Sequence, residues 1–269
     1  MNKFYIQIVF FLLSVSIYLN NKTLATDPTP GKATKTKSKK SCSTSEEIYE
    51  QNKHLLCTDP EEIKNAEGFM KEAVKSFLDH AISVDDYKCK GKNRSNSAFF
   101  YKKKHKDNTD VEKTIYINND PNKYNKVVGD LWNPDILNPI DYKSVKRKIV
   151  RVYNPDLVMI QQRYKDSIFS RWKYFYALAK KVEISEDKTI IAMTSANIND
   201  HNPSNKEYKN KIIENANLFE TEIDSEDDIR KGKLKKTFLN IGGYLIEKKN
   251  RYVDITYVES VRDLQILIT

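Results

Sequence analysis

Hydrophobic residues in the first third of the chain recur at helical spacing after a clear start signal. Asp59 and Pro60 precede two glutamates, which is typical of a helix N-terminus with an aspartate cap and acids near the positive end of the helix dipole. The apolar residues that follow are Ile63, Ala66, Met70, Ala73, Phe77 and Ala81. This spacing predicts a helix that buries one face. A second helix is predicted from Asp120-Pro121 until Pro134 stops it.

Short runs with β character make up most of the remaining chain. They are bounded by turn-forming residues such as Asn154-Pro155-Asp156. The predicted strands cover residues 97–103, 113–118, 145–153, 157–164, 173–183, 189–196, 234–248 and 252–259. Because short connections join antiparallel neighbours, we expect one continuous, curved, largely antiparallel sheet in an α+β domain.

A polar stretch over residues 197–233 interrupts this sheet. Ser204 and Glu207 have the spacing of a helix capping box, and apolar residues follow them from Tyr208 to Phe219. We therefore expect an inserted helix in this stretch.

The strand over residues 157–164 is partly apolar on both faces. Alternation places Leu157, Met159, Gln161 and Arg163 on one face and Val158, Ile160, Gln162 and Tyr164 on the other. We therefore expect helices or a ligand to cover part of each face of this strand. In the strand over 234–248, Gly242 and Gly243 indicate a bulge or a close approach to the backbone, with a simple packing bend as the alternative.

The N-terminal residues read as a secretory leader. An apolar run from Phe4 to Leu19 precedes Thr23-Leu24-Ala25, which suits signal peptidase, so cleavage is expected after residue 25. The run is shorter than the roughly 20 residues of a membrane-spanning helix, although an uncleaved signal anchor is the alternative. Residues 26–45 are rich in Lys, Thr and Pro and predict a disordered spacer. Residues 46–269 are expected to form a single domain.

The chain is basic, with a formal net charge of +9 that falls to +7 when Lys3 and Lys22 leave with the leader. Basic residues are spread among nearly as many acids, which favours an ordinary solvated surface. The alternative is a patch that meets anionic lipid headgroups or nucleic acid. Net charge alone does not separate these partners.

Three cysteines, Cys42, Cys57 and Cys89, follow the leader. In an oxidising compartment one pair can close and one thiol is left over. Cys57 with Cys89 is the favoured pair because the two flank the first predicted helix and Cys42 lies in the spacer.

The sequence offers little for catalysis. It has no CxxC motif, its four histidines are scattered, and it lacks the Gly-x-Ser-x-Gly, HExxH and phosphate-loop motifs. We expect no metal, no cofactor and no enzymatic activity.

Several segments of the strand region carry a family resemblance. They are SVKRKIVRVYNP (144–155), YFYALA (174–179), VEISEDKT (182–189), TSANINDH (194–201), GYLI (243–246) and VDITYV (253–258). The chain resembles the START domain, the steroidogenic-acute-regulatory-related lipid-transfer domain, in the version carried by the fam-a multigene family of rodent malaria parasites. The resemblance to fam-a covers nearly the whole chain, including the leader and spacer.

This resemblance implies a START-like helix-grip fold, in which a curved antiparallel sheet and a C-terminal helix enclose one lipid of the phosphatidylcholine class. The residues expected to line the lipid cavity are Trp132, Met159, Gln161, Arg163, Phe175, Ala177, Thr194, Ile241 and Tyr257. Trp132 matches the family pattern, but Asn133 replaces the expected Asp and no Arg precedes it. Arg163 is the substitute predicted to bind the phosphate, and a surface Arg at a strand end is the alternative.

Two further features follow from the resemblance. The loop over residues 166–171 carries Ile168 and Phe169 beside basic residues, which suits shallow insertion into a membrane surface, unless Phe169 folds back over the sheet. The residues after 260 suffice for a C-terminal helix of only about 15 Å. We therefore expect a truncated lid helix or closure by another surface.

These observations predict a secreted, monomeric phospholipid carrier that contacts membranes transiently and does not bind nucleic acid. The expected location is the parasitophorous vacuole or, after export, the host erythrocyte. The alternative is an exported interaction protein that keeps a degenerate START fold and uses its basic surface, with a hydrolase or cyclase as a third possibility.

Overall fold

The computed structural model describes residues 44–93, 97–105, 109–136, 144–167, 169–203 and 208–263. The predicted leader, most of the spacer and Cys42 lie outside these ranges. The predictions made for them therefore stay predictions.

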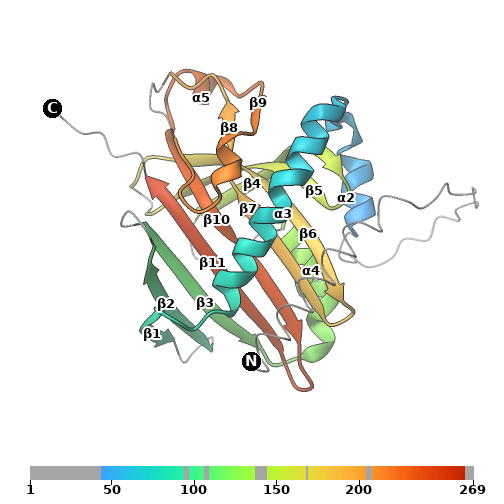
Figure 1. Cartoon of the computed structure of the whole chain (residues 1–269), viewed down its shortest axis with the longest axis vertical. Helices are drawn as coiled ribbons and strands as arrows, with labels where there is room; N and C mark the ends of the chain where they lie inside the picture. Colours follow the sequence, from blue (N-terminus) through green and yellow to red (C-terminus); the bar gives the residue numbers. More distant parts are fainter. Residues whose placement is uncertain are drawn as a thin grey trace, which may run out of the picture. The chain divides into compact units, whose positions relative to one another are not determined.

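A nine-stranded sheet dominates the fold, with strand order β1-β2-β3-β11-β10-β7-β6-β5-β4 (Figure 1). Its strands are β1 (Lys88–Asn93), β2 (Ala98–Lys104), β3 (Asp110–Asn118), β4 (Ser144–Asn154), β5 (Leu157–Lys165), β6 (Lys173–Ser185), β7 (Lys188–Thr194), β10 (Lys235–Lys248) and β11 (Val253–Asp263). All neighbours in this order pair antiparallel, and a short parallel contact adds β10 to β6. The predicted continuous sheet is confirmed. Edge strand β1 was missed because its exposed Lys, Cys and Gly residues carry no apolar alternation.

Both predicted helices are present. They are α3 (Pro60–Ile82) and α4 (Tyr124–Trp132), the latter preceded by the 3₁₀ turn η4 (Pro121–Lys123). The Asp59 carboxylate caps α3 by accepting from the backbone N–H of Glu61 and Glu62 at 2.9 and 3.3 Å. Two short elements before α3 were not predicted, α2 (Ser45–Gln51) and η2 (Lys53–Leu55). None of the helices in the described ranges is long and apolar enough to cross a membrane.

Helices cover the two faces of the sheet unequally. Helix α3 runs across β7, β10 and β11 on one side, which we call the outer face, and α4 lies behind the sheet in the same view (Figure 1). Lys113 of β3 fixes the end of α3 by donating to the backbone carbonyl of His80 at 3.3 Å. On the opposite side, which we call the inner face, Tyr124 of α4 hydrogen-bonds to Thr189 of β7 at 2.8 Å.

The segment over residues 197–233, which we call the insertion, folds mainly without helix. It contains β8 (Asn197–Asn199) parallel to β9 (Glu220–Glu222), the 3₁₀ turn η5 (Glu214–Asn217) and the short helix α5 (Asp227–Arg230). The expected helix after residue 207 is wrong over the described residues from Tyr208 onward. The Asn210 side chain accepts from the backbone N–H of Ile212 and Ile213, at 3.0 and 2.9 Å, and this local turn replaces helical hydrogen bonds.

The end of the chain also differs from the expectation. Strand β11 continues to Asp263, where it pairs with Thr237 of β10, so residues 261–263 are strand rather than helix. Cross-strand pairing along β10 satisfies this backbone. The remaining residues, 264–269, lie outside the described ranges.

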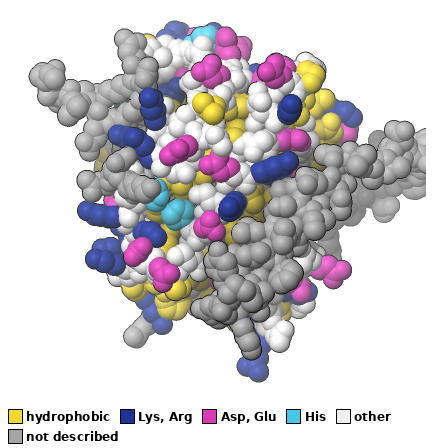
Figure 2. All heavy atoms as spheres, viewed as in Figure 1, with side chains coloured by type: hydrophobic (Ala, Val, Ile, Leu, Met, Phe, Trp, Pro, Cys, Tyr) yellow, Lys and Arg dark blue, Asp and Glu magenta, His cyan; other side chains and the backbone are white. Residues whose placement is uncertain are grey.

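Charged residues are interspersed on the side of the molecule that carries α3. Figure 2 shows Lys and Arg side chains interspersed with Asp and Glu over the centre of this surface, with further Lys and Arg side chains along its left edge. This arrangement agrees with the solvated-surface interpretation of the net charge for that side.

Gly243 marks the closest approach between β10 and β7. Its φ is +143°, and a Cβ atom at this position would lie 2.0 Å from the Ile191 carbonyl oxygen. A β-bulge lies nearby, between Leu239 and Ile241. The close backbone approach predicted at the glycines is therefore confirmed at Gly243, and the bulge of this strand lies before them.

Replacing Gly243 by alanine tests this contact. We expect Gly243→Ala to lower the free energy of unfolding by more than about 3 kcal/mol, because the two central strands must separate to admit the methyl group. Gly68→Ala is the matched control. Gly68 is exposed within α3 with nothing within 4 Å of its added Cβ, so this change should stabilise by about 0.5–1 kcal/mol. Equal denaturation midpoints for both variants would contradict the expected strain at Gly243.

Candidate functional site

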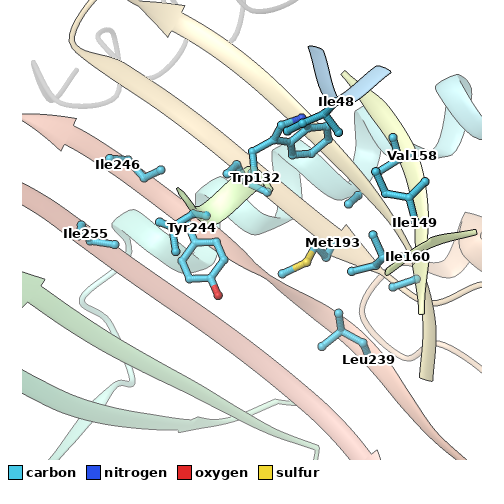
Figure 3. Close-up of a cluster of buried hydrophobic side chains, with 14 of the residues drawn as sticks. Ile48, Trp132, Ile149, Val158, Ile160, Met193, Leu239, Tyr244, Ile246 and Ile255 are labelled. Atoms are coloured by element: carbon cyan, nitrogen blue, oxygen red, sulfur yellow. The ribbon is translucent and has the colours of Figure 1, made fainter. Parts of the chain in front are cut away.

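The inner face of the sheet carries a contiguous cluster of buried apolar side chains, which we call the inner cluster. Its members come from α2, α4 and six strands and include Ile48, Trp132, Ile149, Val158, Ile160, Met193, Leu239, Tyr244, Ile246 and Ile255 (Figure 3). None of its members belongs to α3. The cluster is therefore separate from the apolar contacts between α3 and the outer face.

Trp132 is the most unusual member of the inner cluster. Trp132 is the last residue of α4 and is only 7% exposed. The indole Nε1–H is buried and has no hydrogen-bond partner among the residues that the structure describes. A buried donor without a partner is costly, so this N–H is a candidate donor to a ligand. The adjacent Asn133 side chain accepts from the Asp135 backbone N–H at 2.9 Å and serves a local turn.

The residues predicted to line a lipid cavity divide between the two faces. Trp132, Phe175 and Ala177 belong to the inner cluster, and Tyr257 packs against it. The strand registers place the other five on the outer face, and these are Met159, Gln161, Arg163, Thr194 and Ile241. The alternation predicted for β5 is confirmed, but the two groups cannot line one site together.

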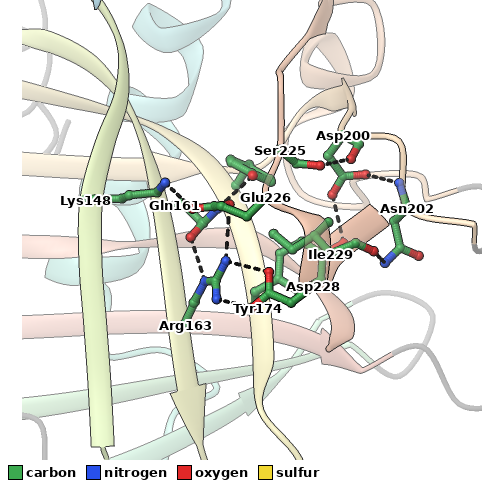
Figure 4. A network of polar contacts seen from close by, with 11 residues as sticks. Lys148, Gln161, Arg163, Tyr174, Asp200, Asn202, Ser225, Glu226, Asp228 and Ile229 are labelled. Atoms are coloured by element: carbon green, nitrogen blue, oxygen red, sulfur yellow. Dashed lines mark hydrogen bonds and ion pairs between the residues drawn. The ribbon is translucent and has the colours of Figure 1, made fainter. Parts of the chain in front are cut away.

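Arg163 is neutralised on the outer face. Its guanidinium contacts the Asp228 carboxylate at 2.6 and 3.1 Å and Glu226 at 3.1 Å, both from the insertion, and it also donates to Gln161 at 2.8 Å (Figure 4). Two carboxylates therefore compensate the charge of this guanidinium. The role of Arg163 in phosphate binding stays a prediction, and in this structure its charge is compensated by the insertion.

Glu226 holds the insertion against the sheet. Burial alone would raise the pKa of its carboxyl group, but hydrogen bonds from Lys148 of β4 and Gln161 of β5 lower that pKa to about 2. Asn210 makes a second attachment by donating to Thr194 at 2.8 Å and to the Asn240 carbonyl at 2.9 Å. The insertion therefore closes this part of the outer face with satisfied polar groups.

A second arginine, Arg147, lies near the inner cluster, and it was not predicted as a site residue. Arg147 of β4 pairs in register with Gln162 of β5, which in turn faces Phe175 of the inner cluster. The Arg147 side chain is half-buried and donates to Gln162 Oε1 through Nε and Nη2, at 3.1 and 2.9 Å. The signal was present in the sequence, because Arg147 alternates with Val145 and Ile149.

The loop between β5 and β6 exposes an aromatic residue. Phe169 is 92% exposed, so the expectation of an exposed apolar tip is confirmed and the alternative, folding back over the sheet, is wrong. Ile168 lies outside the described residues. Beside the tip, the ammonium groups of Lys146 and Lys165 lie 5.4 and 5.2 Å from the centre of the Trp172 ring.

The predicted disulfide between Cys57 and Cys89 is wrong, because both are free thiols. The Cys57 backbone N–H bonds to Val152 of β4 at 2.8 Å, whereas Cys89 lies in β1, at the other end of the strand order. Helix α3 has 23 residues, so its ends are separated by about 35 Å, far beyond the Cα separation of a disulfide.

Burial raises the pKa of the Cys57 thiol. The described residues contain no group of three metal-ligating side chains.

Replacing Glu226 by glutamine tests how the insertion is held. We expect Glu226→Gln to lower stability by about 1 kcal/mol at pH 7, a modest value because this group is partly exposed to solvent. The folded pKa lies near 2 and the unfolded value near 4.5, so the wild-type advantage should be complete above about pH 4.5 and disappear as the pH falls towards 2.

Asp227→Asn is the control for that experiment. Asp227 is exposed and pairs with Lys231 one helical turn away, so its removal should leave the denaturation midpoint unchanged. Chemical denaturation between pH 2 and pH 7 measures both variants. A pH-independent loss in Glu226→Gln would contradict the proposed role of the charge.

The fold is similar to that of a solved lipid transfer protein. Human StAR-related lipid transfer protein 5 superposes with a TM-score of 0.54 at 9% identity, covering 76% of this chain and 85% of that chain. Human STARD10 gives a TM-score of 0.48 at 12% identity, over 73% of this chain and 69% of that chain. Neither a protein-family model nor a curated protein sequence matches the chain. The part of the chain that the structure describes therefore has the α+β helix-grip fold of StAR-related lipid transfer (START) domains.

Proposed function

We propose that this protein binds a phospholipid against the inner face of its sheet and transfers it between membranes. The observation that carries the proposal is the inner cluster, a contiguous set of buried apolar side chains on one face of a START-type sheet. It includes Trp132, whose indole N–H has no partner among the described residues. An apolar environment of this kind favours acyl chains over water. A ligand oxygen near Trp132 would supply the missing acceptor.

Phosphatidylcholine is the lipid class that we propose, on the strength of the sequence resemblance to fam-a START domains. The motifs that carry this resemblance lie mainly in strands β4, β6, β7, β10 and β11, which also supply most of the inner cluster. We propose no catalytic step, because binding and release of an intact lipid require none. A monomer that binds no nucleic acid suffices for this activity.

The proposed place of action is outside the cell that makes the protein. The apolar run at residues 4–19 supports secretion. The family resemblance extends the proposal to a malaria parasite, with delivery to the parasitophorous vacuole or the host erythrocyte.

The loop between β5 and β6 is the proposed membrane contact. Phe169 is exposed, and the basic residues Lys165 and Arg171 flank the loop. A large apolar side chain beside cationic groups suits shallow insertion among anionic headgroups.

Lipid analysis of the purified protein tests the proposed function directly. We expect organic extraction of the full chain, produced in a secreting eukaryotic host, to release about one phospholipid per chain, since one apolar site holds one ligand. Mass spectrometry identifies the lipid, and transfer between donor and acceptor vesicles measures the activity. If the protein carries no stoichiometric lipid and transfers none, the proposal fails and a non-lipid interaction protein is favoured in its place.

Phe169→Asp tests the membrane contact. We expect the transfer rate between vesicles to fall several-fold because a carboxylate at the tip opposes insertion, while the bound lipid and melting temperature stay unchanged. Leu218→Asp is the matched control, since Leu218 is 79% exposed on the insertion. Equal transfer rates for the two variants would exclude a specific role for the loop.

A further inference from the structure

Arg147 brings a guanidinium group to the apolar side of the sheet. Two residues away on β4, Val145 packs against the inner cluster and Ile149 belongs to it. Its cross-strand partner Gln162 lies between Ile160 and Tyr164, two further members of the cluster. The charge is therefore placed at the β4–β5 margin of the proposed acyl-chain surface.

The partners of Arg147 leave its charge uncompensated. Among the residues that the structure describes, it hydrogen-bonds to the neutral Gln162 amide and forms no ion pair with a carboxylate. Two lysines of β6 on the same face differ in this respect, since Lys173 pairs with Asp166 at 2.5 Å and Lys181 with Asp156 at 3.5 Å. Half-burial of an unneutralised guanidinium favours an anionic ligand.

The geometry leaves donors for such a ligand. A guanidinium has five N–H groups, and the bonds to Gln162 involve Nε and Nη2, so Nη1 remains available. The Gln162 amide oxygen fixes the plane of the guanidinium without cancelling its charge. A fixed guanidinium suits bidentate contact with a phosphate.

We propose that Arg147, oriented by Gln162, binds the phosphate of a phospholipid whose acyl chains lie along the inner cluster. This inference rests on the proposed lipid-binding function and adds the residue that selects the headgroup. Headgroup selection is thereby assigned to Arg147 on the inner face instead of Arg163 on the outer face, whose charge is neutralised.

Binding of two fluorescent lipids with identical acyl chains tests the assignment. The probes are NBD-labelled phosphatidylcholine and NBD-labelled diacylglycerol, which differ by the phosphocholine group. We expect Arg147→Gln in the full chain to weaken phosphatidylcholine binding about tenfold or more, because charge-assisted bidentate bonds are lost. Diacylglycerol binding should stay unchanged. Lys146→Gln removes one charge from the exposed outer side of the same strand and should change neither affinity.

Gln162→Glu provides a second variant that does not depend on removing the arginine. A carboxylate at position 162 would neutralise Arg147 within the fold, so phosphatidylcholine binding should fall as in Arg147→Gln while the melting temperature is kept. Unchanged phosphatidylcholine binding in both variants would overturn the assignment of Arg147 and leave the lipid-binding function intact.

Three further outcomes would each overturn the assignment in a different way. Equal loss of both probes in Arg147→Gln would show that the arginine has a structural role. With NBD-labelled stearate as a third probe, a loss of stearate binding alone in Arg147→Gln would identify a carboxylate ligand in place of the phosphate. A wild-type protein that binds neither glycerolipid would overturn the proposed function together with the assignment.

Discussion

The register between β4, β5 and β6 decides on which side of the sheet each side chain lies, and the position of the proposed lipid site depends on it. Because strand side chains alternate, a shift of one residue would exchange the two faces. With the observed register, Val158 and Ile160 join the inner cluster, while Met159 and Gln161 face the insertion. The same alternation separates Arg147 from its neighbours Lys146 and Lys148.

The two arginines on opposite faces of the sheet differ in how their charges are compensated. On the outer face, the insertion brings Glu226 and Asp228 to Arg163, so the desolvated guanidinium is fully paired. On the inner face, Arg147 keeps a neutral partner and Trp132 keeps an unpaired donor among the described residues. A closed polar network favours stability, whereas unpaired donors beside apolar surface favour a ligand.

Helix α3 and the insertion together explain why the outer face is closed. Apolar residues of α3 pack on the central strands, and Phe69 of α3 meets Phe219 of the insertion with ring centroids 5.1 Å apart. Within the described ranges, the inner face is covered by two shorter helices, the seven-residue α2 and the nine-residue α4. This asymmetry, more than the composition of either face, favours the inner face as the place for a ligand.

Local signals were enough to place most of the regular structure. The Asp59-Pro60 start of α3, the Asp120-Pro121 turn before α4 and eight of the nine sheet strands follow from capping residues, turn residues and side-chain periodicity, which act over a few residues. The predicted helix after Tyr208 failed because the Asn210 side chain competes for the backbone. Strand β1 was not predicted because it lacks apolar residues.

The candidate site depends on contacts that local signals do not specify. The sequence by itself determined that β5 has two distinct faces, with Arg163 on one of them, and that the loop after β5 carries an apolar tip. Tertiary structure alone decided that the insertion neutralises Arg163, that Gln162 faces Arg147 and that Cys57 and Cys89 lie far apart. The physical reason is that charge compensation and disulfide geometry depend on residues many positions away, whose meeting is fixed by packing rather than by periodicity.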